Sequence, residues 1–226
     1  MPGGGWCDAD CRDQPQLYSV DDGKAAAAAR NAAPGAIIEG ITCHNSPPAI
    51  QGPEDDAICR PFVLAEVDSA AAAGADAIII ACFDDPALDE ARARVSIPVL
   101  GIGEAGFHAA MMLGRRFSVV TTLPVAIPIL EENLSHYGLA AACVRVRAAG
   151  VEVLELEDET SGAVPRVSAE IGRAKAEDGV GAIVLGCAGM ADLAAKLEAE
   201  HGLKVIDGVG AAAAFAAALI NLRRGS

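Results

Sequence analysis

The stretch VLAEVDSAAAAGADAIIIAC, residues 63–82, recurs farther along the chain as VSAEIGRAKAEDGVGAIVLGC, residues 167–187. Each copy has the pattern of an amphipathic helix, a short turn with glycine, and a continuous apolar run that ends at a cysteine. Such runs are typical of strands that are buried on both faces of a parallel sheet. The two cysteines, Cys82 and Cys187, stand 105 residues apart. The repeat therefore predicts a duplicated α/β unit.

The segments that follow each copy also correspond. After each cysteine we expect a helix, another apolar strand and an alanine-rich helix, over 86–94, 97–102 and 105–113 in the first copy and over 190–200, 203–207 and 211–222 in the second. This alternation predicts two pseudo-symmetric parallel-sheet lobes of the Rossmann or flavodoxin-like kind, with an interdomain cleft. We assign residues 1–98 and 208–226 to the first lobe, to which the C-terminal helix returns, and 99–207 to the second.

The start of the first copy is the main anomaly. The strand expected at FSVVTT, residues 117–122, requires a counterpart near residue 12, where the chain is RDQPQL. That segment has neither apolar continuity nor β-branched side chains. The sequence therefore predicts that the first strand is atypical or missing, and that the first sheet has an unpaired edge.

Composition excludes several classes of protein. The 226 residues carry a net charge of −14 and have no basic run, so nucleic acid is not an expected partner. The most apolar stretch, residues 209–222, is shorter than the roughly 20 residues that span a membrane. The N-terminus has no secretory signal pattern, so we expect a cytoplasmic protein that contacts no membrane.

Cys82 and Cys187 suggest a specific chemistry. Ligands of open α/β sheets bind at the carboxyl ends of strands, and each cysteine follows such an end, just before an expected helix whose N-terminus would lower the pKa of the thiol. After Cys82, we expect Asp85 to be the N-cap of that helix and Pro86 its first residue. If the lobes face each other, one sulfur lies on each side of a bound molecule. One thiolate then removes a proton from carbon and the opposite thiol returns one, without metal or cofactor.

Two further roles are open to the cysteines of this chain, core packing and metal binding. A single cysteine is more often a buried core residue than a catalytic one, although two at matching strand ends favour function. Cys7, Cys11, Cys43 and Cys59 with His44 offer thiols and an imidazole for zinc, but no CxxC or HxxxH pair is present. We therefore expect no metal site.

Several motifs resemble the aspartate/glutamate/hydantoin racemase superfamily, and within it the hydantoin and allantoin racemases. They are IQGPED (50–55), IIIACFDDP (78–86), IPVLGIGEAGFH (97–108), FSVVTT (117–122) and LGCAGM (185–190). The resemblance implies that Cys82 and Cys187 are the acid/base pair and that the protein is a homo-oligomer. It also implies that the substrate ring is bound by Thr121 and Thr122 and by the backbone around Phe83, Gly186, Ala188 and Gly189.

The sequence also departs from the superfamily pattern. Amino-acid racemases that it resembles carry Asn-Thr after the first cysteine and Thr-His after the second, where this chain has Phe83 and Ala188-Gly189. These residues imply a less polar pocket, suited to a neutral five-membered ring. The Asn-Pro-Asn-Thr turn that usually follows the first strand is absent before Tyr18.

The sequence thus predicts a racemase of 5-substituted hydantoins or allantoin that uses two cysteines and a small-molecule substrate. Two alternatives stay open. One is a maleate cis/trans isomerase or an arylmalonate decarboxylase, which requires polar groups for substrate carboxylates. The other is a non-catalytic two-lobed binding protein, suggested by the atypical N-terminus.

Overall fold

A computed structural model describes residues 16–19, 23–113, 116–158 and 160–225 of the chain. It contains two four-stranded sheets in which every pairing is parallel. The first sheet has the order β2 (Ile37–Gly40), β1 (Gln16–Ser19), β3 (Ala77–Ile80), β4 (Val99–Gly101). The second has the order β6 (Cys143–Ala148), β5 (Phe117–Thr121), β7 (Ala182–Gly186), β8 (Lys204–Asp207). The two orders correspond strand for strand, which confirms the predicted duplication.

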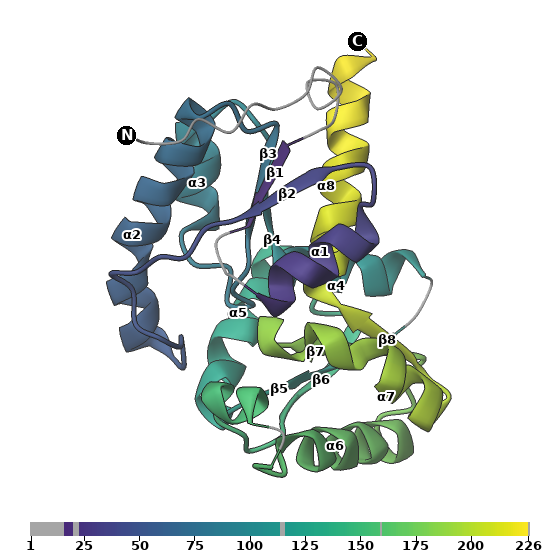
Figure 1. Ribbon diagram of the computed structural model, residues 1–226. Coiled ribbons are helices and arrows are strands. Elements are labelled where there is room, and N and C mark those ends of the chain that lie inside the picture. Colours follow the sequence, from purple (N-terminus) through teal and green to yellow (C-terminus); the bar gives the residue numbers. More distant parts are fainter. Residues whose placement is uncertain (1–15, 20–22, 114–115, 159, 226) are drawn as a thin grey trace.

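Helices separate the strands and cover the sheets (Figure 1). In the first half they are α1 (Lys24–Ala32), α2 (Pro53–Ala72), α3 (Leu88–Arg94) and α4 (Ile102–Met112). In the second half they are η2 (Pro124–Ala126), α5 (Ile127–His136), η3 (Val153–Glu157), α6 (Ala163–Glu177), η4 (Ala188–Leu193), α7 (Ala194–His201) and α8 (Gly208–Arg224). Strands β3, β5 and β7 are buried along their whole length, as their continuous apolar sequences predicted. No described helix is both long and apolar enough to cross a membrane.

Helices α4 and α8 are exchanged between the two lobes. Helix α4 follows β4 of the first sheet but packs against β7 and β8 of the second, whereas α8 follows β8 and packs against β3 and β4. Figure 1 shows α8 running along the first sheet to the C-terminus. This packing agrees with our interpretation that the C-terminal helix returns to the first lobe.

The exchange requires close contact where the two helices begin. A Cβ atom on Gly208 would lie 2.3 Å from the carbonyl oxygen of Ile102. Only glycine permits this approach of one helix start to the other.

The boundary expected after residue 98 lies three residues too early for the first sheet. Strand β4 pairs with β3 through Gly101, because the apolar run that begins at Ile97 continues the first sheet. In chain order, α4 is then the first element of the second lobe. The division of the chain into two lobes with these limits otherwise remains our interpretation.

The prediction of a missing first strand was wrong. Strand β1 occupies residues 16–19 and lies between β2 and β3, so the edge expected to be unpaired is filled. A central strand obtains backbone hydrogen bonds from both neighbours, which stabilises even a short segment whose own sequence is a poor strand former. Residue 12, where the counterpart was expected, lies outside the described residues, as do 20–22, which follow β1.

Candidate active site

One cavity of about 550 Å³ lies at the carboxyl ends of both sheets. We call it the interlobe cavity, because its walls come from the segments that follow β2, β3, β5 and β7. All eight residues expected in the site line it: Cys82, Phe83, Thr121, Thr122, Gly186, Cys187, Ala188 and Gly189. Residues 105 positions apart are thus brought together by matching strand ends, as the duplication requires.

The two cysteines reach the interlobe cavity from different sheets. Cys82 comes two residues after β3 ends, and Cys187 comes directly after β7. Both side chains are partly exposed. Charge on Cys187 raises the pKa of Cys82, so the two sulfur atoms are near enough to interact electrostatically. One thiol from each sheet therefore reaches the same cavity.

The expected lowering of the Cys82 pKa by a helix N-terminus is not found. Helix α3 begins only at Leu88, after Ala87 in a left-handed conformation with φ of 58°. Burial raises the pKa of Cys82 well above its ordinary value, and the negative charge of Asp84 raises it further. These surroundings favour the protonated thiol of Cys82 over the thiolate.

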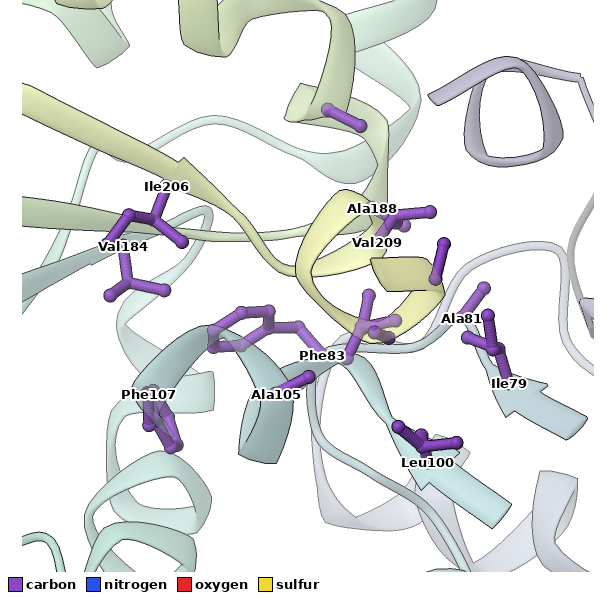
Figure 2. Packing of buried hydrophobic residues seen from close by; sticks show 14 of the residues in the cluster. Ile79, Ala81, Phe83, Leu100, Ala105, Phe107, Val184, Ala188, Ile206 and Val209 are labelled. Atoms are coloured by element: carbon purple, nitrogen blue, oxygen red, sulfur yellow. The ribbon is translucent and has the colours of Figure 1, made fainter. Parts of the chain in front are cut away.

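Phe83 does not form an apolar wall of the cavity with its ring. The side chain is 3% exposed and packs edge to face against Phe107, with ring centroids 5.4 Å apart. Figure 2 shows the ring directed toward Val184 and Ile206 of the second sheet, inside the core. The backbone of Phe83 is what remains for the cavity, and the expectation that its ring makes the pocket less polar was wrong.

Thr121 and Gly186 hold the end of β7 in place. The two residues are register partners in the β5–β7 pair, and the Thr121 hydroxyl donates a hydrogen bond of 3.0 Å to the Gly186 carbonyl. The Thr121 hydroxyl therefore fixes the end of β7, the strand that precedes Cys187. The hydroxyl of Thr122 has no hydrogen-bond partner in the part of the chain that the structure describes, so it is available to a ligand.

We expect Gly186→Ala to lower kcat/KM about 10- to 100-fold. The new Cβ would lie 2.8 Å from Cβ of Thr121, so β7 must shift away from β5 and displace Cys187. Racemisation kinetics check this result, with Gly172→Ala as the control. A Cβ on Gly172 meets only His201 at 3.7 Å, an ordinary contact. Equal activity of the two variants would contradict the assigned role of Gly186.

The turn after Cys82 carries two buried carboxyl groups with different surroundings. Asp85 was expected to cap the helix that follows it, but it accepts hydrogen bonds from the N–H groups of Gly103 and Glu104 at the start of α4 and from the Tyr137 hydroxyl. The Asp84 carboxylate has no donor among the described residues, and Asn133 donates instead to the Asp84 backbone carbonyl. Asp84 lines the interlobe cavity and was missed in the sequence analysis.

Asp84 makes stability depend on pH in a predictable direction. Burial, and then the charge of Asp56, raises the pKa of Asp84 to about 7, compared with about 3.9 in an unfolded chain. Since the folded state binds the proton more tightly, this contribution to stability is complete below about pH 4 and is lost as the pH rises through 7.

We expect Asp84→Asn to raise the free energy of unfolding at pH 8 by about 2 kcal/mol and to have little effect at pH 4. Urea unfolding at the two pH values measures the difference. Asp68→Asn is the control, because Asp68 is exposed on α2 and pairs with Arg94 at the surface, so its loss should change stability by less than about 1 kcal/mol at both pH values. A uniform loss of stability in Asp84→Asn at both pH values would contradict this account.

The loop after β2 forms the remaining wall, which the sequence analysis also missed. It contributes Cys43, His44 and the proline pair at 47–48, and Cys59 of α2 lies beside it. The rule that strand ends carry ligand sites applied equally to β2 and would have found this loop. Within the described ranges no three His, Cys, Asp or Glu side chains are placed to hold a metal ion, and Cys7 and Cys11 lie outside those ranges.

A two-lobed α/β enzyme with a cysteine from each lobe at one cavity is the class that this fold and site define. The chain belongs to the Asp/Glu/hydantoin racemase family, whose model matches residues 22–216.

Individual relatives agree with this assignment. A hydantoin racemase of Rhizobium meliloti is 48% identical over 176 residues, which cover 78% of this chain and 73% of that protein. The structure of an allantoin racemase from Klebsiella pneumoniae is 39% identical with a TM-score of 0.88, covering 93% of this chain and 88% of that one. An allantoin racemase structure from Pseudomonas fluorescens is 32% identical with a TM-score of 0.86, covering 93% and 92%.

Proposed function

We propose that the protein is a cofactor-independent racemase of 5-substituted hydantoins or allantoin, in which Cys82 and Cys187 exchange the proton of the stereogenic carbon. The observation that carries the proposal is the presence of both cysteines, one from each lobe, in the interlobe cavity. The names of the similar proteins, hydantoin racemase and allantoin racemase, support the substrate class.

The proposed reaction uses opposite faces of the ring. One cysteine, as thiolate, removes the proton from the stereogenic carbon, and the other, as thiol, delivers a proton to the opposite face. The carbanion is stabilised by delocalisation onto the neighbouring carbonyl oxygen of the ring. Ala188 and Gly189 open η4, where backbone N–H groups have no acceptor within the helix, and we propose that they stabilise this oxygen. The Thr122 hydroxyl supplies a further polar contact to the ring.

The charge of the cavity favours a neutral substrate. Of the described residues that line it, none is a lysine or an arginine, and one is the buried Asp84. Maleate and arylmalonates carry two carboxylates, which such a wall would leave without a cationic partner. The lining of the cavity, and not the ring of Phe83, therefore disfavours the isomerase and decarboxylase alternatives.

The test is loss of optical activity with enantiopure substrates. The purified protein is incubated with a panel of 5-substituted hydantoins and with allantoin, and a reaction without protein corrects for spontaneous racemisation. We expect catalysed racemisation of at least one ring. Binding of these rings in calorimetry without solvent deuterium entering the stereogenic carbon would instead indicate the non-catalytic binding protein. Conversion of maleate or arylmalonate, followed by NMR, would indicate the other enzymes.

We also propose a cytoplasmic location and a homo-oligomeric state. The proposal of self-association is supported by exposed apolar side chains at the end of α4 and along α8, among them Met112, Leu113, Leu219 and Leu222. Light scattering during size-exclusion chromatography measures the mass of the particle.

A further inference from the structure

The proposed proton transfer does not explain why Asp84, a carboxyl group in the cavity wall, is buried. Its side chain is 7% exposed, and it lies two residues beyond Cys82 in the wall of the interlobe cavity. Its negative charge acts on the sulfur atoms of both Cys82 and Cys59, which also line this wall. Asp84 and the two cysteines therefore share one wall of the interlobe cavity.

The carboxyl group also lacks a donor. Asp85, the next residue, accepts three hydrogen bonds, whereas the described part of the chain provides none to the Asp84 carboxylate. A buried carboxylate without donors is costly, and the cost is recovered when a ligand supplies them. The nearby charge that acts on Asp84 is that of Asp56, which adds to the cost. A substrate that brings N–H donors into the interlobe cavity would supply the missing partner.

We propose that Asp84 is a specificity-determining residue that accepts hydrogen bonds from N–H groups of the substituent on the stereogenic carbon, outside the ring. The proposal rests on the proposed racemase function and names its preferred substrate class, a hydantoin ring with an N–H-bearing substituent such as the ureido group of allantoin. A ureido group presents two N–H donors side by side, which match the two oxygen atoms of a carboxylate. An alkyl substituent offers no donor to Asp84, and an acidic substituent is repelled by it.

The proposal predicts a change in substrate preference in Asp84→Asn. The amide keeps the size of the side chain but replaces one acceptor oxygen with a donor, which opposes the ureido N–H groups. We expect kcat/KM for allantoin to fall about 10- to 100-fold, mostly through a higher KM, and kcat/KM for an alkyl hydantoin to change less than about threefold. Steady-state racemisation of both substrates measures the ratio.

Asp56→Asn is the matched control. It removes a negative charge from the same neighbourhood, but Asp56 does not line the cavity and pairs with Arg60. The preference for allantoin over the alkyl hydantoin should therefore stay as in the wild type. If Asp84→Asn does not fold, as judged by thermal unfolding, Asp84→Ser replaces it, and the same loss of preference is expected.

The outcomes separate this inference from the proposed function. An unchanged ratio in the Asp84 variant, with the wild type active on both rings, overturns the role of Asp84 and leaves the racemase intact. Wild-type activity on alkyl hydantoins with none on allantoin likewise overturns the inference alone. Wild-type protein that racemises no ring refutes the proposed function itself.

Discussion

Serine in place of Cys82 or of Cys187 is expected to stop racemisation, while hydrogen exchange continues on one face of the substrate. General acid–base groups contribute about 10²- to 10⁴-fold to rate, and a serine hydroxyl is too weak an acid to replace a thiol in this role. We therefore expect kcat for racemisation to fall by about 10²- to 10⁴-fold in Cys82→Ser and in Cys187→Ser. Each variant keeps one thiol, so it can still remove a proton from one enantiomer and return a deuteron to the same face.

The experiment uses each enantiomer separately in deuterated water, with NMR of the hydrogen on the stereogenic carbon and chiral chromatography of the product. We expect Cys82→Ser to exchange one enantiomer with retention and Cys187→Ser to exchange the other. Cys143→Ser is the control, because Cys143 lies on β6 and does not line the interlobe cavity. Full interconversion of the enantiomers by either single variant would exclude two-base transfer.

The second large effect is expected from Gly208→Ala. The new methyl carbon would lie 2.3 Å from the carbonyl oxygen of Ile102 and 3.1 Å from its carbonyl carbon. Because these are backbone atoms at the start of α4, neither helix can yield by a side-chain rotation. We expect the free energy of unfolding to fall by about 3 kcal/mol, which corresponds to roughly 6 to 12 °C in Tm for a chain of this size.

Thermal unfolding followed by circular dichroism checks this result. Gly172→Ala in α6 again serves as the control, since its Cβ has room and alanine is favoured over glycine in a helix by about 1 kcal/mol. Its Tm should stay the same or rise. A Gly208→Ala variant as stable as Gly172→Ala would show that the two helix starts do not meet as closely as described.

The parts of the fold that sequence predicted well are those in which local pattern and burial agree. Strands β3 and β7 are central and covered on both faces, so their sequences are apolar without interruption, and the cysteines mark where each run ends. Duplication then allowed the weaker elements of one half to be located from the other. The strand orders of the two sheets correspond for the same reason.

The errors arose where tertiary contacts override local sequence. Strand β1 is held by two neighbouring strands, so its own residues carry little of the signal that identifies a strand. The turn Cys82 to Pro86 resembled a capped helix start, yet Asp85 caps α4 across the lobe junction, 18 residues away. Phe83 followed a strand end and was assigned to the pocket, but α4 brings Phe107 within reach of its ring. The sequence around a residue does not predict contacts with residues that are distant along the chain.

The reciprocal placement of α4 and α8 limits how the two halves of the molecule can move relative to each other. The chain passes between them twice, at residues 101–102 and 207–208, and the two passages touch at Gly208 and Ile102. A single tether would permit both bending and torsion, whereas two adjoining ones permit rotation mainly about the axis through both. We therefore expect relative motion of the two halves to be a rotation about this axis, with little torsion across it.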